Sequence, residues 1–288
     1  MRSAADRIEA RLGALLAPPT DTLVPLRVDG QRIGFLTPER AQRLARFDVF
    51  RRRADALEIA CERRERDGAM AEVARTLAAE GALSAWRDER YAVRTQFDAS
   101  PLFEIERAAA RYLGIRTYAA HVNGLVRASD GIRMWLARRS ATKAIDPGML
   151  DNLVGGGIAA GTTIVDTVVK ESWEEAGIPA ATARQATQTA ELTVFRQQRD
   201  GIQHETIYAH DLWLPPDWAP ENQDGEAVEH RLVTLAAAAG IIASETPPDV
   251  MTADASLVTL DCLVRLGAIA PRGSFARLAR AGVNIDDP

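Results

Sequence analysis

The sequence has few of the residues that mark disulfide-rich, zinc-binding or nucleic-acid-binding proteins. Its two cysteines, Cys61 and Cys262, lie far apart in 288 residues, which excludes a disulfide framework or a cysteine-based zinc site. Lysine is nearly absent, with only Lys143 and Lys170, so almost all the positive charge is arginine. The formal net charge of -5 excludes a basic field that would attract nucleic acid. A phosphate-bearing ligand would have to be held locally, by a metal ion and a few arginines.

Long apolar runs are missing as well, and no stretch is long enough to span a bilayer as a helix. Near the start, Arg2, Asp6 and Arg7 stand where the apolar core of a signal peptide would lie. The composition, 47% hydrophobic and 26% charged, is that of an ordinary globular protein, and the length favours two domains. We therefore expect a cytoplasmic protein with two domains and no membrane partner.

The first 114 residues predict a small α+β domain in which no catalytic cluster appears. Hydrophobic periodicity, turn residues and helix caps define its elements. The predicted elements are an amphipathic helix at 1–17, strands on either side of Asp29-Gly30, a helix at 37–44, two helices divided at Gly68 within 54–82, a strand at 91–94 and a helix at 101–114.

Residues 115 to 288 predict a second domain of mixed strands with one helix in the middle and one near the end. This order of elements favours an α/β/α sandwich built on a mixed sheet. The predicted elements are a hairpin at 118–126 and 132–139, a glycine loop at 155–157, a helix ending at 176, a hairpin at 193–199 and 205–214, a strand at 225–235 and a helix at 255–266.

Three carboxylates follow the glycine loop at helical spacing. Glu171, Glu174 and Glu175 share one face of the predicted helix, where like charges cost about 0.2–0.5 kcal/mol per pair. A bound cation reverses the sign of this interaction. Hard divalent ions such as Mg²⁺ take oxygen ligands from a few carboxylates and share their shell with substrate phosphates. The pattern therefore predicts a Mg²⁺ or Mn²⁺ site.

The same helix has a second apolar side. Val165, Val169 and Trp173 recur at helical spacing and are expected to pack on the core. Gly177 stands where a left-handed residue ends a helix, and Pro179 prevents its continuation. The helix is therefore predicted to end at Ala176.

The stretch from 155 to 178 resembles the Nudix box, the strand-loop-helix-loop signature of enzymes that hydrolyse a diphosphate joined to another group. It departs from the family pattern at Thr162, Lys170 and Ser172, where the family has Glu, Arg and an aliphatic residue. With U an aliphatic residue, the pattern G-x5-E-x7-R-E-U-x-E-E-x-G-U aligns at Gly156, Glu171, Glu174, Glu175, Gly177 and Ile178.

Nearly the whole chain resembles one branch of that family, which is related to thiamine diphosphate and carries an N-terminal domain. The segments that carry this resemblance are 23–30, 120–124, 135–140, Lys143, 147–154, 224–226 and 260–265. It implies an accessory domain at 1–114, a Nudix domain at 115–288, and hydrolysis of thiamine diphosphate to the monophosphate and orthophosphate. The oxo and oxy damaged analogues of thiamine diphosphate are also implied as substrates.

The resemblance also implies roles for individual acids. Glu171, Glu174 and Glu175 would bind the metal ion, which lowers the pKa of an attacking water. One of these, or an acid of the later strand at Glu226 or Glu229, would be the general base, and the family comparison favours Glu229. Glu171, Glu174 and Glu229 are the catalytic candidates.

Substrate-binding residues are expected around the box. Arg138, Arg139 and Lys143 follow a strand and could pair with phosphate oxygens, although only one of the two arginines is expected to contact ligand. Gly156 and Gly157 could bring backbone close to phosphate, since no Cβ intervenes. Asn152 is a further candidate, since it matches the branch closely. A wall for a cationic ring could come from the aromatic residues, although core packing is the expected role for most of them: Trp135, Tyr208, Trp213 and Trp218.

Other functions stay open at this point. A Nudix enzyme of this kind could act on another nucleoside diphosphate derivative such as ADP-ribose, or the domain could bind ligand without catalysis. Isopentenyl diphosphate isomerases share the fold, but they need a catalytic cysteine and neither Cys61 nor Cys262 lies near the box. The arginine-rich segments at 51–53 and 63–66 are expected to be solvated faces or a homodimer contact.

Overall fold

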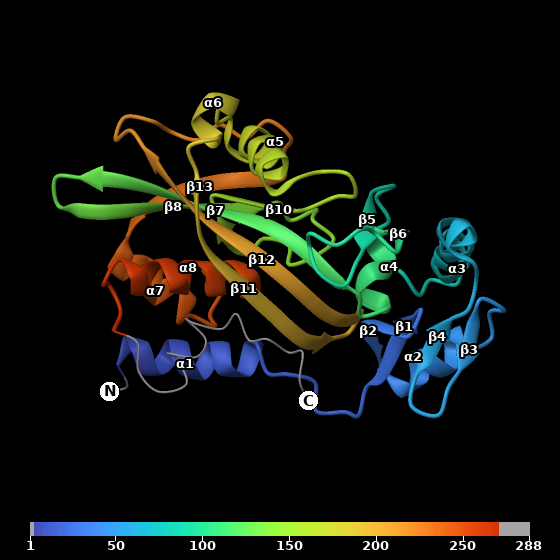
Figure 1. Ribbon diagram of the computed structural model, residues 1–288. Coiled ribbons are helices and arrows are strands. Elements are labelled where there is room, and N and C mark those ends of the chain that lie inside the picture. The colour runs from blue at the N-terminus through green and yellow to red at the C-terminus, as the bar shows by residue number, and fades with distance from the viewer. Residues whose placement is uncertain (1–2, 271–288) are drawn as a thin grey trace.

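A seven-stranded mixed sheet forms the centre of the computed structural model, which describes residues 3 to 270 (Figure 1). The order of its main path is β11-β12-β7-β8-β13, while β10 pairs with β7 and β9 pairs with β8. β7 runs parallel to β12, and the other pairs are antiparallel. The strands are β7 Arg116–Ala128, β8 Gly131–Arg139, β9 Leu150–Asn152, β10 Val154–Gly157, β11 Thr187–Gln198, β12 Gly201–Leu214 and β13 Ala227–Thr234.

Helices cover both faces of this sheet, which confirms the expected α/β/α sandwich (Figure 1). Val122 of β7 packs in the core beneath one helical layer, and Leu125 packs in the core beneath the other, because the odd number of steps between them reverses the side-chain direction. The first layer holds α5 Ile164–Ala176 and α6 Ala180–Ala183. The second holds α7 Leu235–Ile242, which was not anticipated, α8 Ala253–Arg265 and α1 Ala4–Leu15.

The first helix, α1, packs against the last two helices of the described residues, α7 and α8. Ile8 and Leu12 of α1 are fully buried in the same core as residues of α7 and α8. Arg11 donates to the carbonyls of Ile242 and Met251, at 2.9 and 2.6 Å, and its side chain is buried. α1 therefore packs on the second helical layer, below α7 and α8 in Figure 1.

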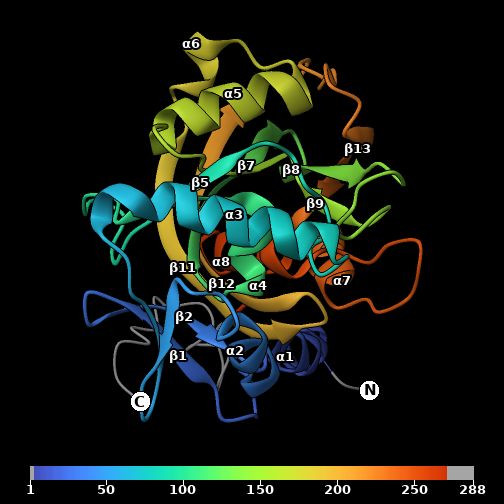
Figure 2. The same cartoon turned by 90° about the vertical axis from the view of Figure 1, so that its right-hand side faces the viewer.

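Residues 24 to 115 build a separate core around a four-stranded sheet of order β2-β1-β4-β3. In Figure 2, α3 crosses in front of the large sheet, with α5 above it and β1 and β2 below. The elements are β1 Val24–Val28, β2 Gln31–Leu36, α2 Pro38–Leu44, β3 Phe50–Arg52, β4 Leu57–Ile59, the 3-10 turn Arg63–Glu65, α3 Arg66–Ala79, the hairpin β5 Arg90–Val93 and β6 Phe103–Glu106, and α4 Arg107–Tyr112.

Two helix predictions in this part were wrong. Residues 57 to 59 form a strand, because Leu57 and Ile59 alternate into the core and β4 pairs with both β1 and β3. Gly68 does not divide two helices but lies in the first turn of α3. Residues 103 to 106 pair with β5, so the helix expected from 101 begins only at Arg107.

The outer face of α5 also differs from the prediction. Val165 and Trp173 are 49% and 52% exposed, so they do not pack on the core, whereas Val169 is partly buried against it. The buried face instead contains Val168, Ser172 and Ala176 at helical spacing. The helix does end at Ala176, with Gly177 in the left-handed conformation at φ 66°.

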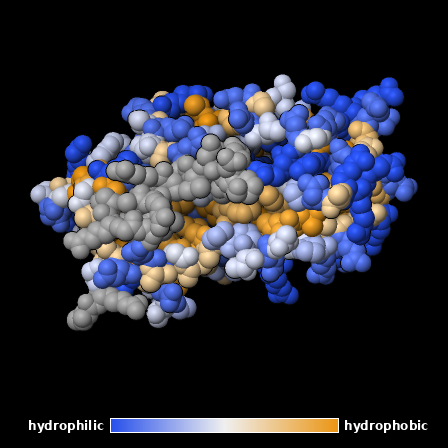
Figure 3. All heavy atoms as spheres, turned by 60° about the horizontal axis from the view of Figure 1, so that its bottom comes forward, coloured by the Kyte–Doolittle hydropathy of each residue, from blue (hydrophilic) through white to orange (hydrophobic). Residues whose placement is uncertain are grey.

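The surface is hydrophilic where the arginine-rich segments lie. Arg51, Arg52 and Arg53 are exposed, as are Arg63 and Arg64. In Figure 3 hydrophilic residues cover much of the end that holds the four-stranded sheet, and hydrophobic residues gather near the middle of that face. Across residues 3 to 270, no helix combines the length and the apolar character needed to cross a membrane.

Candidate active site

The glycine strand β10 is the narrowest point of the site. A Cβ on Gly155 would meet the His121 ring, one on Gly156 would overlap the Glu171 carboxyl, and one on Gly157 would overlap the Tyr91 hydroxyl. These three side chains come from β7, α5 and β5. The glycines therefore allow three elements to close on one strand, and the space beside Gly156 and Gly157 is filled by protein side chains.

Two donors contact the carboxylates of α5, the Lys170 ammonium and the Gly155 amide. Lys170 Nζ lies 3.1 Å from Glu171 Oε1 and 2.7 Å from Glu174 Oε2, so one ammonium bridges the two acids. The Gly155 amide donates to Glu175 Oε2 at 2.8 Å. Within residues 3 to 270, no three His, Cys, Asp or Glu side chains already converge as a set of metal ligands.

Burial sets the electrostatics of this face. It raises the pKa of the Glu171 carboxyl, and it raises that of Glu175 well above its ordinary 4.5, with the charges of Glu171 and Asp151 adding to the effect. The positive charge of Lys170 offsets this effect at Glu171 only in part, so ionised Glu171 and Glu175 call for further positive charge nearby. A divalent cation would supply that charge, so the oxygen donors of α5 fit a hard metal ion.

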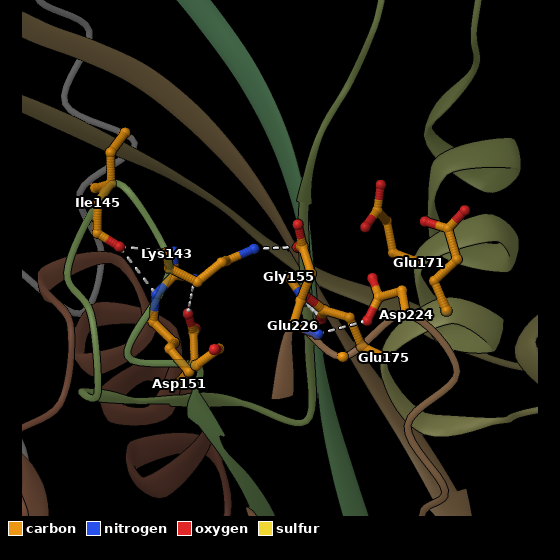
Figure 4. Close-up of polar contacts among 12 residues, drawn as sticks. Lys143, Ile145, Asp151, Gly155, Glu171, Glu175, Asp224 and Glu226 are labelled. Atoms are coloured by element: carbon orange, nitrogen blue, oxygen red, sulfur yellow. Dashed lines mark hydrogen bonds and ion pairs between the residues drawn. The ribbon is translucent and has the colours of Figure 1, made fainter. Parts of the chain in front are cut away.

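A cavity of about 380 Å³ opens beside β10. Its lining comes from the box, the loop that follows β8, and the segment from 84 to 111 that precedes the large sheet. Residues of β7 and β12 and the segments 224–226 and 252–254 complete it. Figure 4 shows Lys143 pointing toward Gly155 and Glu226 from one side, with Glu171 and Glu175 on the other. Of the predicted site residues, those that line the cavity are Arg139, Lys143, Gly156, Gly157, Glu171 and Glu174.

Lys143 and Arg139 hold their loop in place. Lys143 forms an ion pair with Glu226, which also pairs with Arg87 at 3.1 Å. Burial alone would raise the pKa of Glu226, but these two cations outweigh it and hold the pKa at about 2. Arg139 donates to Asp151 at 2.9 Å and to backbone carbonyls of its own loop. Glu226 thus lines the cavity as an ionised carboxylate.

Four predicted residues, Arg138, Asn152, Glu175 and Glu229, are not among the described residues that line the cavity. Arg138 pairs with Glu229 at 2.6 Å and with Asp249 at 2.9 Å. Hydrogen bonds from Arg231 and Arg138 hold the pKa of Glu229 at about 2. Asn152 is buried, and its amide group contacts His121, Asn123 and Thr259. Arg138 and Glu229 therefore form an ion-pair network at a distance from the glycine strand, and Asn152 supports the sheet.

Of the four aromatic residues, Trp135, Tyr208 and Trp218 pack in the core, as favoured, and form no wall of the cavity. Trp135 and Trp218 pack edge to face with ring centroids 6.1 Å apart, and neither lines the cavity. Tyr91 lines it instead and carries Arg107 above its ring, 5.5 Å from the centroid. The sequence predicted that Tyr91 lies in a strand, but it did not predict that this strand contacts the glycines.

A second group of carboxyl groups, from Glu205 and Asp254, also lines the cavity. Gln203 Nε2 donates to both oxygens of Asp254, at 3.0 and 2.9 Å, and to Glu205 Oε2 at 3.0 Å. Burial, helped by the charge of Glu205, raises the pKa of Asp254 to about 6. No sequence pattern points to these residues as a group, because β12 and α8 contribute them separately.

A glycine strand, a carboxylate helix and a mixed sheet between two helical layers together define the class of this domain. Residues 117 to 254 match the NUDIX domain family, and the chain therefore contains a Nudix domain. Residues 17 to 117 match a second family, described as a domain of unknown function (DUF4743). The protein thus joins an N-terminal DUF4743 domain to a Nudix domain.

Relatives with the same type of domain are Nudix hydrolases. Nudix hydrolase 20, chloroplastic, of Arabidopsis thaliana is 37% identical over 210 residues, which cover 73% of this chain and 55% of that protein. Nudix hydrolase 24, chloroplastic, of the same plant is 37% identical over 207 residues, which cover 72% and 56%. The chain spans a little over half the length of these relatives. Crystalline DR0079 from Deinococcus radiodurans is 24% identical, covers 59% of this chain and 97% of that one, and gives a TM-score of 0.42.

Proposed function

We propose that this protein is a metal-dependent diphosphohydrolase. One observation carries the proposal: Glu171 and Glu175 of the box contact a glycine strand beside a cavity large enough for a small diphosphate. Water would attack one phosphorus atom, and the bridging P–O bond would break to leave two phosphate-bearing products. The relatives named as Nudix hydrolases support the same chemistry.

The metal ion is proposed to be Mg²⁺ or Mn²⁺, held by Glu171, Glu174 and Glu175. When bound, it would lower the pKa of the attacking water and balance charge on the diphosphate. Lys170 would have to release Glu171 and Glu174, since its ammonium now bridges both. Glu226 is a better placed general base than Glu229, because it lines the cavity. Its ion pairs with Lys143 and Arg87 would have to loosen before it could accept a proton, since they hold its pKa at about 2.

The preferred substrate is proposed to be thiamine diphosphate or its oxo and oxy analogues. The whole-chain resemblance supports this choice. The cavity adds that the carboxyl groups of Glu205 and Asp254 line it, and these would attract a cationic ring. ADP-ribose and nucleoside diphosphates are the competing substrates.

The test is product analysis by chromatography after incubation with Mg²⁺ and thiamine diphosphate, its oxo and oxy forms, ADP-ribose, or nucleoside diphosphates. We expect thiamine monophosphate and orthophosphate, and loss of turnover in Glu174→Gln. Glu72→Gln, an exposed acid of α3, is the control and should behave as the wild type. Preference for ADP-ribose would reject the thiamine assignment, and tight binding without turnover by the wild type would reject the enzyme.

A further inference from the structure

The cavity contains many acids for a site that would bind an anion. A diphosphate bound there must be matched by cationic side chains in addition to any metal ion. The carboxyl groups on its lining are those of Glu89, Asp146, Asp151, Glu171, Glu174, Asp200, Glu205, Asp224, Glu226 and Asp254, and the cations are Arg87, Arg107, Arg111, Arg139, Lys143 and Lys170.

Most of these cations are already engaged by protein acceptors. Arg139 uses Nε, Nη1 and Nη2 on Asp151 and on the carbonyls of its loop. Lys170 bridges two acids of α5, while Lys143 and Arg87 share Glu226. Arg111 pairs at 3.2 Å with Asp200, in the turn between β11 and β12. Arg139 and Lys170 would have to give up contacts to hold a phosphate, whereas Arg87 and Arg111 each donate to an acid through Nη1 alone.

Arg107, like Arg87 and Arg111, uses only Nη1 on a protein acid, but it differs from them in lying over Tyr91 beside the glycine strand. Its Nη1 donates to Glu89 Oε2 at 2.6 Å, and its Nε and Nη2 have no acceptor among residues 3 to 270. Nε and Nη2 form the side of the guanidinium whose two parallel donors bind phosphate bidentately. The Arg107 amide also donates to the Glu89 carbonyl at 2.8 Å, which fixes the start of α4 on β5. Glu89 therefore orients Arg107 and leaves its phosphate-binding edge available.

The position of Arg107 places that edge next to the box. Its guanidinium lies over the Tyr91 ring, and the Tyr91 hydroxyl fills the space beside Gly157, one residue from the glycine that Glu171 covers. Tyr91 is only 7% exposed, so the platform under Arg107 is fixed. The positive charge of Arg107 also acts on Glu171, where it opposes the rise in pKa that burial causes.

We infer that Arg107 binds a phosphoryl oxygen of the substrate, so that the DUF4743 domain supplies part of the diphosphate site. The inference rests on the proposed function and assigns to the accessory domain a direct contact with the ligand. Residues before the large sheet would then take part in substrate binding as well as in folding.

The experiment measures binding of methylenediphosphonate, a diphosphate that cannot be hydrolysed, to the full chain in Mg²⁺ by calorimetry. Arg107→Ala should weaken binding about tenfold or more, the loss expected for a hydrogen bond between charged groups. Arg107→Lys should recover part of the loss, because it keeps the charge without the bidentate edge. Arg90→Ala is the matched control, since Arg90 lies on β5 and pairs with Glu104 outside the cavity lining.

Glu89→Gln separates binding from a structural role. If Arg107 only stabilises the fold through Glu89, this variant should reproduce the loss seen in Arg107→Ala, and the inference is wrong. If Arg107 binds phosphate, Glu89→Gln should bind the probe at least as tightly as the wild type, because a negative charge beside the phosphate is removed. Unchanged binding in Arg107→Ala would also overturn the inference.

Turnover of thiamine diphosphate keeps the two proposals apart. A wild type that binds methylenediphosphonate through Arg107 but hydrolyses none of the diphosphates would reject the enzyme and retain the site. In an active protein, Arg107→Ala should raise KM about tenfold or more, in line with its lost binding. A wild type that is active with an Arg107→Ala variant of equal KM would reject the site and retain the enzyme.

Discussion

The Tyr91 hydroxyl occupies the space where a Cβ atom on Gly157 would lie. Tyr91 comes from β5 of the accessory domain and Gly157 from β10 of the large sheet, so this contact joins the two parts of the protein at the candidate site. Any side chain at 157 must push the two apart.

Gly157→Ala should therefore destabilise the fold by about 1–3 kcal/mol, the usual cost of overpacking. Urea unfolding measures the change. Tyr91→Phe removes the hydroxyl oxygen that the new methyl group would meet first, so the double variant should recover part of the loss. Gly68→Ala in α3 is the control, since nothing lies within 4 Å of a Cβ there and stability should not fall. Equal stability of Gly157→Ala and wild type would show that the contact is absent.

Divalent metal should stabilise the protein through α5. At about 100 times its Kd, Mg²⁺ or Mn²⁺ contributes about 2.7 kcal/mol of unfolding free energy, so Tm should rise by several degrees. Glu171→Gln and Glu174→Gln should reduce that rise, while Glu72→Gln on the exposed face of α3 should keep it. Differential scanning calorimetry with and without EDTA checks the result. A rise of the same size in all four proteins would place the metal elsewhere.

The pKa of Asp254 predicts a pH dependence of stability. Its folded value is raised from 3.8 to about 6, mainly by burial, so the folded state binds the proton more tightly than the unfolded state. The contribution of this proton to the free energy of unfolding is complete below pH 3.8 and is lost as pH rises through about 6. Asp254→Asn should therefore be more stable than wild type at pH 8, on the order of 1–2 kcal/mol, and should lose this advantage near pH 4.

Urea unfolding across pH 4 to 8 tests this prediction. The same change at the exposed Asp217 is the control and should give the wild-type profile. A difference between Asp254→Asn and wild type that does not vary with pH would contradict the raised pKa.

Arg138 and Lys143 should differ in what they do. Arg138 donates to Glu229, Asp249 and two carbonyls, so Arg138→Ala should lower stability by on the order of 2–3 kcal/mol and change kcat/KM less than about threefold. Lys143 lies in the cavity lining, so Lys143→Ala should reduce kcat/KM about tenfold or more. Steady-state kinetics with thiamine diphosphate, read beside unfolding curves, distinguishes them. A large kinetic loss in Arg138→Ala at unchanged stability would restore it to the site.

The sequence predicted the long strands of the large sheet and the box helix, because their signals are local. It missed the short strand β9, and residues 155 to 157, predicted as a loop, pair with β7 as part of β10. The hairpin around Asp200-Gly201 alternates clearly, and the box helix carries its own cap at Gly177. The strand at 57 to 59 was missed because three residues are too few to show a period among arginines and glutamates, and only its pairing with β1 and β3 defines it.

The site was only partly predictable for a related reason. The α5 carboxylates could be read from their spacing, but Tyr91, Arg107, Gln203 and Asp254 reach the cavity from four separate elements. Arg138 and Arg139 illustrate the limit, since neighbouring residues of a strand point to opposite faces and the sequence does not say which face holds the cavity. The structure puts Arg139 on the cavity side and ties Arg138 to Glu229.

The packing of α1 has a consequence for how the accessory region can be removed. Because Arg11 and Ile8 are buried against the last helices, the region around β1 to α4 is an insertion between the first helix of the sandwich and its first strand. A fragment that starts at residue 115 would uncover apolar surface on α7 and α8 and is expected to aggregate. A soluble excision has to keep residues 3 to 17 and rejoin them to β7 by a linker.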